Sequence, residues 1–217
     1  MASQNITVAV SSYNNGPEWS DAGNVLGKAS VNNGSYAYTQ STGSNTGGRN
    51  ITYVVTIPSK SSLGLPADAT ITGATMYAGL YAGQNNGQDI SGNPSIVTSV
   101  TTPFGVSFSR SYGGGGAWSN QSAAIPTLPA FGQSYSIGVV GTWNSNILNI
   151  AAQKRSAVSH LYLVLTVTWA DDTGESHLAL NGTRIPVGKL YATGGVQVKK
   201  ATRTADGAVL YRLPGIS

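Results

Sequence analysis

Short runs of alternating apolar and polar residues recur along this chain, and they predict β-strands rather than helices. Residues 70–83 (TITGATMYAGLYAG) alternate clearly, and the set containing Ala74, Met76 and Leu80 is the more consistently apolar, so we expect it to face the core. Residues 160–169 (HLYLVLTVTW) are largely apolar on both sides, as expected of a central strand. Further strands are predicted over residues 6–10, 35–38, 51–57, 96–100, 104–108 and 135–143.

Turn signals separate these strands at short intervals. Asn33-Gly34, Pro58 and Asn85-Asn86-Gly87 are examples, since Asn and Gly tolerate the backbone angles of tight turns and Pro ends strand pairing. Residues 147–153 form the only plausible short helix. Many short strands joined by turns are typical of an antiparallel β-sandwich, so the predicted fold class is all-β and jelly-roll-like.

The composition agrees with a globular all-β protein. Only 9% of the 217 residues are charged, against about 25% in an average domain, while 28 are glycine. Hydrophobic residues make up 40%, with 11 Tyr and 4 Trp, which is too much apolar surface for a disordered chain. The absence of cysteine excludes disulfides, thiolate zinc sites and a cysteine nucleophile.

The sequence also predicts that this chain works without a membrane anchor. No apolar run approaches the roughly 18 residues of a membrane span. The first residues, MASQNITVAV, lack the basic flank and long apolar core of a signal peptide. We therefore expect a protein that is made and used without signal-peptide export.

Charge density changes near Asp171, which predicts a domain boundary there. Residues 171–217 carry six of the 12 basic and four of the eight acidic residues in less than a quarter of the chain. Short strands are predicted over residues 184–187, 195–199 and 208–212, giving a small β-hairpin appendage. It has too few large apolar side chains to be stable alone, so we expect a docking or oligomerisation arm (residues 171–217) on a sandwich domain (residues 1–170). The candidate assembly residues of this arm are Lys199, Lys200, Arg203, Tyr211 and Arg212.

Few residues of the sequence indicate catalytic or metal-binding chemistry. His160 and His177 are the only histidines, and neither accompanies a G-x-S-x-G nucleophile motif, so a hydrolytic triad is not predicted. Asp171, Asp172 and Glu175 carry the oxygen ligands that calcium prefers, but a solvated junction is the favoured interpretation of these residues. The sequence therefore predicts a non-enzymatic protein without a cofactor.

Aromatic residues are the remaining candidates for binding. Trp19, Trp118, Trp143 and Trp169 fit three roles, namely core packing, stacking on a sugar, and a subunit interface. Trp118 follows four glycines and precedes polar residues, so it is the best surface candidate, with Tyr112 or Tyr81 as its partner in a sugar-binding concavity. Nucleic-acid binding is not expected, because no aromatic residue interleaves with the basic residues near Lys199.

The order of several motifs resembles a β-sandwich domain of structural proteins in tailed bacteriophages. The resemblance spans roughly residues 15–169 and departs from the family pattern in an insertion over residues 59–65 and in a long glycine-rich loop. The motifs that carry it are Trp19, NVLG at residues 24–27, NGSYA at 33–37, LPADATITGA at 65–74, Trp118, Phe131-Gly132 and the strand at 160–169.

This resemblance implies a virion component assembled in the bacterial cytoplasm. We expect contacts with other virion proteins and a homo-oligomer of cyclic symmetry. A minor tail, tail-tip or fibre-associated protein is favoured over a capsid decoration protein, and a carbohydrate-binding module that recognises a host-surface glycan is the alternative. The loops expected to project are those near residues 13–19, 42–50, 85–93 and 113–121.

Overall fold

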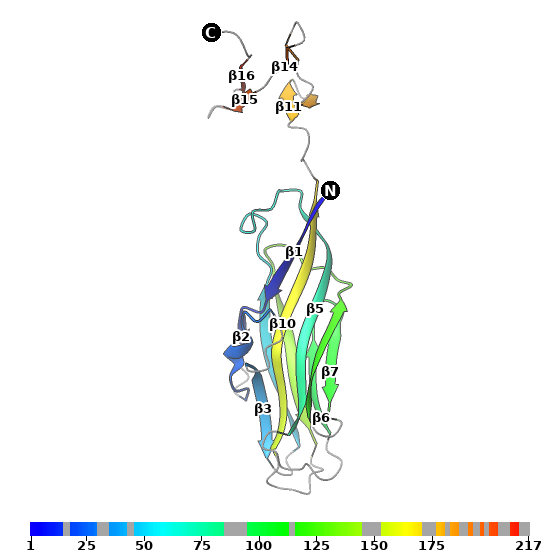
Figure 1. Cartoon of the computed structure of the whole chain (residues 1–217). Helices are drawn as coiled ribbons and strands as arrows, with labels where there is room; N and C mark the ends of the chain where they lie inside the picture. The colour runs from blue at the N-terminus through cyan, green and yellow to red at the C-terminus, as the bar shows by residue number, and fades with distance from the viewer. Residues whose placement is uncertain are drawn as a thin grey trace. The chain divides into compact units, whose positions relative to one another are not determined.

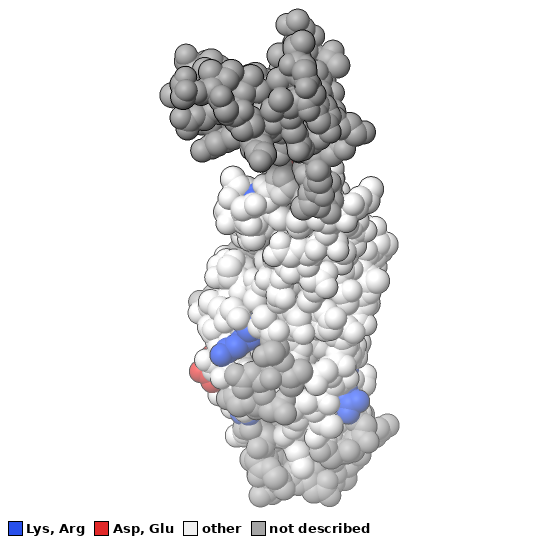
Figure 2. Space-filling view, turned by 45° about the horizontal axis from the view of Figure 1, so that its top comes forward, with Lys and Arg blue, Asp and Glu red and all other residues white. Residues whose placement is uncertain are grey.

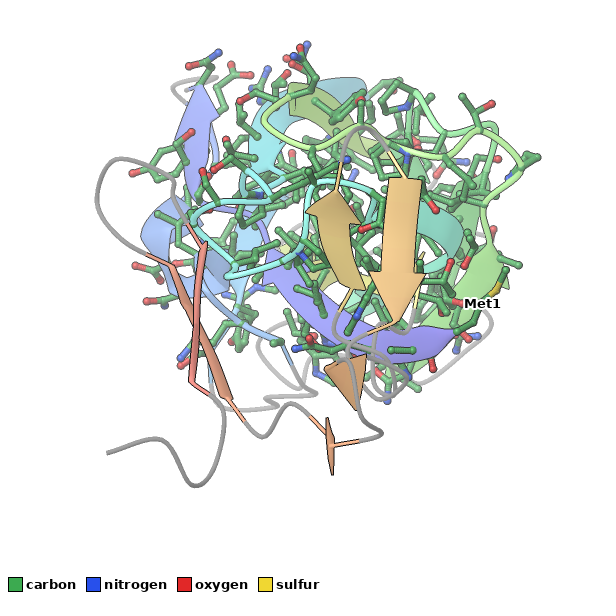
Figure 3. All side chains as sticks on the ribbon, turned by 90° about the horizontal axis from the view of Figure 1, so that it is seen from above. Met1 is labelled. Carbon is green, nitrogen blue, oxygen red and sulfur yellow. The ribbon has the colours of Figure 1, made fainter. Side chains whose placement is uncertain are left out.

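The computed structural model describes residues 1–14, 18–29, 35–42, 46–84, 95–112, 116–144 and 153–170, together with the backbone of six short strands between residues 177 and 212. Contacts divide the chain into two compact units, Ala2–Trp169 and Ala170–Ser217, the second including Met1. Met1, labelled in Figure 3, is fully exposed.

Two antiparallel five-stranded sheets form the first unit, so the predicted all-β sandwich is confirmed (Figure 1). The first sheet, sheet A, has the order β1-β10-β5-β8, and β3 also pairs with β10. Its strands are β1 (Ala2–Ala9), β3 (Ala37–Thr42), β5 (Thr70–Gln84), β8 (Ala117–Ala124) and β10 (Gln153–Trp169). The second sheet, sheet B, has the order β2-β4-β9-β6-β7, formed by β2 (Ser12–Asn14), β4 (Gly47–Thr56), β6 (Ile96–Thr101), β7 (Ser107–Ser111) and β9 (Ser134–Trp143).

The core lies between the two sheets and follows the predicted alternation. On β5, Ala74, Met76 and Leu80 are buried, as expected from their period of two. On the central strand β10, Leu161, Leu163, Leu165 and Val167 are fully buried, while their neighbours point to the other face. Each large apolar side chain buried in this way stabilises the fold by about 1.5–3 kcal/mol. Figure 3 looks along the strands and shows the side chains as sticks filling the sandwich.

Four sequence predictions differ from the structure, wholly or in part. The strand expected at residues 104–108 begins later, at Ser107, because Gly105 adopts a positive φ of 80° and turns the chain between β6 and β7. Residues 117–121, expected in a projecting loop, belong to strand β8. Likewise, residues 47–50 belong to β4 rather than to a loop. Of the predicted helix, residues 147–152 lie outside the described part of the chain, and Gln153 opens β10.

A single short helix appears among the described residues, the 3-10 turn η1 (Ala22–Val25), which packs Ala22 and Val25 into the core. The described strands of the second unit form three two-stranded antiparallel sheets. They are β11 (His177–Leu180) with β12 (Thr183–Pro186), β13 (Tyr191–Ala192) with β14 (Val196–Gln197), and β15 (Lys200–Arg203) with β16 (Val209–Arg212).

Candidate ligand-binding face

Strand register brings Trp118 and Tyr81 together on the outer face of sheet A. Trp118 on β8 is the partner of Tyr81 on β5, and their ring centroids lie 5.4 Å apart. Alternate residues of β5, such as Met76 and Leu80, point into the core, so Tyr77 and Tyr81 point outward. Both Trp118 and Tyr81 are half-buried rather than buried. The two residues are therefore adjacent, Tyr81 on the predicted strand and Trp118 on strand β8 rather than in the expected loop.

Two tyrosines that the sequence did not single out extend this group. Tyr38 on β3 lies in register with Ala157, which is itself in register with Tyr81, so the three share one face. The ring of Tyr36 lies 5.5 Å from that of Trp118 and 5.9 Å from that of Tyr38. We call these four residues, Tyr36, Tyr38, Tyr81 and Trp118, the aromatic cluster.

Arg155 of β10 holds Tyr38 of β3 and the preceding Tyr36 in place. Its guanidinium carbon lies 4.0 Å from the centroid of the Tyr38 ring, within the range of a cation–π contact. The same group donates a hydrogen bond of 2.9 Å to the Tyr36 hydroxyl and another of 2.9 Å to Oε1 of Gln40. The charge of Arg155 is thus directed onto aromatic and neutral polar partners.

Tyr112, the other predicted partner of Trp118, has different neighbours. It packs against a small separate core cluster formed by Ala82, Ile96 and Trp143.

Burial raises the pKa of Tyr81, and the nearby Tyr112 adds to that rise while Arg155 opposes it. The Tyr81 hydroxyl donates a hydrogen bond of 2.6 Å to the carbonyl of Gln84, and this bond fixes the orientation of the Tyr81 ring.

A β-bulge in β10 shapes the neighbouring part of the same face. The register with β5 shifts between Val158 and His160, so that Ser159 is the extra residue opposite Gly79. Ser159 and His160 are both buried, and the Ser159 hydroxyl lies 2.9 Å from Nδ1 of His160. Gly79 is required here, because a Cβ at this position would lie 2.5 Å from Cε1 of His160 and would overlap the Ser159 hydroxyl.

An open pocket of about 250 Å³ lies next to this bulge. Its lining combines two tyrosine rings with neutral polar groups contributed by three strands. The Tyr77 and Tyr162 rings stack in parallel with centroids 4.7 Å apart, and His160 lies 5.6 Å from Tyr162. The complete lining is Tyr77, Asn120, Gln121, Ser122, His160 and Tyr162.

The chemistry of this pocket is neutral. Burial lowers the pKa of His160, which keeps its imidazole uncharged at neutral pH. The Ser159 hydroxyl engages Nδ1 of this ring, and the imidazole is almost fully buried, so it forms part of the pocket wall. Among the residues that the structure describes, the pocket lining contains no carboxylate. A pocket with stacked rings, amides, a hydroxyl and a neutral imidazole suits a polyhydroxylated ligand.

The remaining sequence candidates belong to the second unit, Ala170–Ser217. Asp171, Asp172, Glu175 and Lys199 lie outside the described residues. Lys200 and Arg203 are in β15, and Tyr211 and Arg212 are in β16, with Lys200 opposite Arg212 and Ala201 opposite Tyr211. Within the described ranges, no group of acidic residues or histidines could hold a metal ion. The calcium site and the assembly arm stay predictions.

The described surface carries few charges, as Figure 2 shows for one side of the molecule. Arg49 and Glu18 form an ion pair at 2.7 Å, and both side chains are about half exposed. Among the described residues there is no helix long and apolar enough to cross a membrane.

No protein-family model and no curated protein sequence match this chain. Among solved structures, the chain is similar to a carbohydrate-binding module, TmCBM61, in complex with β-1,4-galactotriose, at 9% identity and a TM-score of 0.36, over 74% of this chain and 86% of that one. It is also similar to the enzymatically active domain of tailspike protein 4 of bacteriophage CBA120, at 9% identity and a TM-score of 0.32, over 76% of this chain and 19% of that one. Both similarities are remote, and they show neither a ligand nor an activity of this chain.

Proposed function

We propose that this chain is a non-enzymatic component of a tailed-phage virion whose sandwich binds a glycan of the host surface. The observation that carries glycan binding is the outer face of sheet A, where Tyr81 and Trp118 of the aromatic cluster share strands β5 and β8 with the pocket beside His160. Aromatic rings stack on the apolar faces of sugars, and nearby amides and hydroxyls hydrogen-bond to sugar hydroxyls.

The sparse charge of the chain supports a neutral ligand. Only 9% of all residues are charged, and the pocket lining contains none. A phosphate or nucleic-acid ligand needs several cations around its anionic groups. Arg155, the cation of the aromatic cluster, already donates to Tyr36 and Gln40. We therefore place neutral sugars ahead of anionic ligands.

The virion assignment rests on the order of sequence motifs between residues 15 and 169 that resembles tailed-phage structural proteins. A minor tail, tail-tip or fibre-associated position is favoured over capsid decoration, because a glycan-binding face serves adsorption where the particle meets the cell. Contacts with other virion proteins and a homo-oligomer formed through residues 171–217 belong to the same proposal. A surface with few charges suits such packing, since buried unpaired charges are costly.

A binding role is preferred to an enzymatic one because of the pocket lining. Glycoside hydrolysis commonly needs two carboxyl groups on either side of the scissile bond. The described lining offers one titratable imidazole and two tyrosines instead. Ser159, which bonds His160, is itself fully buried and does not line the pocket, so it cannot reach a substrate as a nucleophile.

The test is binding of the full chain to an array of bacterial lipopolysaccharide and capsule glycans, with Trp118→Ala as the variant. Tyr13→Ala, another half-buried aromatic but on sheet B, is the matched control. We expect selective binding that Trp118→Ala weakens by about tenfold or more and Tyr13→Ala leaves unchanged. Binding to no glycan, or equal loss in both variants, would overturn the glycan role. Immunogold labelling of purified phage particles at a site other than the tail would overturn the tail position.

A further inference from the structure

The aromatic cluster and the pocket lie in consecutive positions along the same two strands. Tyr77, Gly79 and Tyr81 are alternate residues of β5 and point to one side of the sheet. Their register partners on β8 are Ser122, Asn120 and Trp118 in the same order. Tyr77 belongs to the pocket and Tyr81 to the cluster, and four residues of extended strand separate their Cα atoms by roughly 13 Å.

Gly79 lies midway between the two sites, and Ser159 and His160 of β10 fill the space that a side chain at this position would take. It has no side chain, and the opposite residue on β8 is Asn120, an exposed amide that also lines the pocket. On the β10 side, the bulge turns Ser159 and His160 over Gly79, so a buried imidazole covers the gap. A ligand that runs from the stacked Tyr77 and Tyr162 rings toward Trp118 thus passes the exposed amide of Asn120.

We propose, resting on the glycan-binding function above, that these two sites are adjacent sugar subsites, so that the protein selects a neutral linear oligosaccharide over a monosaccharide. One sugar occupies the pocket beside His160, and a later sugar in the same chain stacks on Trp118. Asn120 and Ser122 hydrogen-bond to the sugar in the pocket. Linking the subsites increases affinity, because the second sugar binds as part of an already bound chain.

One oligosaccharide that spans both subsites is favoured because the pocket and the aromatic cluster lie on the same face of sheet A. The pocket alone, at about 250 Å³ and open on one side, contributes few hydrogen-bonding groups, and the cluster alone contributes mostly stacking. Neither is a strong site by itself, whereas a chain that spans both uses all of these groups at once.

The experiment measures, by calorimetry on the full chain, affinity for length series of neutral gluco-, manno- and galacto-oligosaccharides that begin with the monosaccharide. The test variant is Asn120→Ala with Ser122→Ala, which changes two exposed side chains of β8. The matched control is Thr101→Ala with Ser107→Ala, two exposed register partners in sheet B.

We expect affinity to rise with length until both subsites are filled. The test variant should lose about tenfold in affinity for the longer sugars, while the control stays unchanged. Equal affinity for the monosaccharide and the longer sugars, or no effect of the test variant on a chain that does bind, would overturn the two-subsite inference and leave the glycan role intact. If Trp118→Ala also has no effect and no array glycan binds, the proposed function itself fails.

Discussion

The indole of Trp118 packs against the ring of Tyr81 with centroids 5.4 Å apart, because β8 and β5 place these two residues directly opposite each other. The sandwich holds Trp143 differently. Trp143 at the end of β9 is 4% exposed and packs with Ala82 and Ile96, whereas Trp118 is half-buried. The sequence left both core and surface roles open for tryptophan, and the structure places Trp143 in the core and Trp118 at the surface.

This division predicts unequal stability effects for two equal truncations. Trp143→Ala should lower the free energy of unfolding by about 3–5 kcal/mol, as expected for a buried aromatic side chain. Trp118→Ala should lower it by about 1–2 kcal/mol, because much of the indole already contacts solvent. Urea denaturation of both variants measures the difference. Equal losses would contradict the assignment of Trp118 to a surface.

Replacement of Gly79 should disturb the β-bulge. A Cβ at residue 79 would lie within 2.6 Å of Nδ1 of His160, so Gly79→Ala must displace the imidazole or the backbone, at a cost of about 1–3 kcal/mol. Gly73→Ala is the control in the same strand, since its nearest contact would be Thr166 Cβ at an ordinary 3.7 Å. Thermal unfolding should separate the two variants. A Gly79→Ala protein as stable as Gly73→Ala would show that the imidazole does not lie over residue 79.

Stability should decrease below neutral pH because of His160. Burial lowers the pKa of this residue in the folded state, whereas the unfolded chain keeps the ordinary value near 6.5. As the pH falls below 6.5, the unfolded state therefore binds the proton first, and the folded state loses stability until its own pKa is passed. Tyr77 and Tyr162 are the other titratable groups of the pocket, and β8 contributes neutral residues only.

His160→Gln tests this dependence, because glutamine cannot bind the proton. Urea midpoints measured from pH 7.5 down to about pH 5 should fall for the original chain and fall less for His160→Gln. Parallel pH profiles for the two proteins would mean that His160 is not the group responsible.

Tyr53 anchors η1 to sheet B. Its hydroxyl is buried and donates a hydrogen bond of 3.2 Å to the carbonyl of Ala22, and burial raises the pKa of the phenol far above its usual value. Tyr53→Phe should cost about 1–2 kcal/mol, because it leaves the Ala22 carbonyl without this donor in a buried setting. Tyr13→Phe, on the half-buried ring that packs beside Tyr53, is the control and should change the urea midpoint much less.

Removal of residues 171–217 tests the assembly arm. Both sheets of the sandwich lie within Ala2–Trp169, so a chain that ends at Ala170 should remain folded, with a cooperative thermal transition. Under the arm proposal, light scattering gives a closed oligomer for the full chain and a monomer for the shortened one. Monomers in both cases would remove homo-oligomerisation through residues 171–217 from the proposal.

The sequence by itself determined the fold class and much of the core. Alternation with a period of two identified which side of β5 is buried, and continuous apolarity identified β10 as central, because burial on one or both faces of a sheet dictates those patterns directly. It did not identify β8. Residues 117–124 (AWSNQSAA) form an edge strand with little apolar surface, so no period of two is visible there.

Only the tertiary structure decided which residues form the candidate face. Tyr38, Arg155, Tyr81 and Trp118 are far apart in sequence and meet because three strand pairings set their register. The bulge that turns Ser159 and His160 toward Gly79 depends on one extra residue in β10, which alternation alone does not reveal. Register and bulges arise from long-range pairing, and this is why the sequence indicated Trp118 and Tyr81 while the pocket beside them emerged only from the fold.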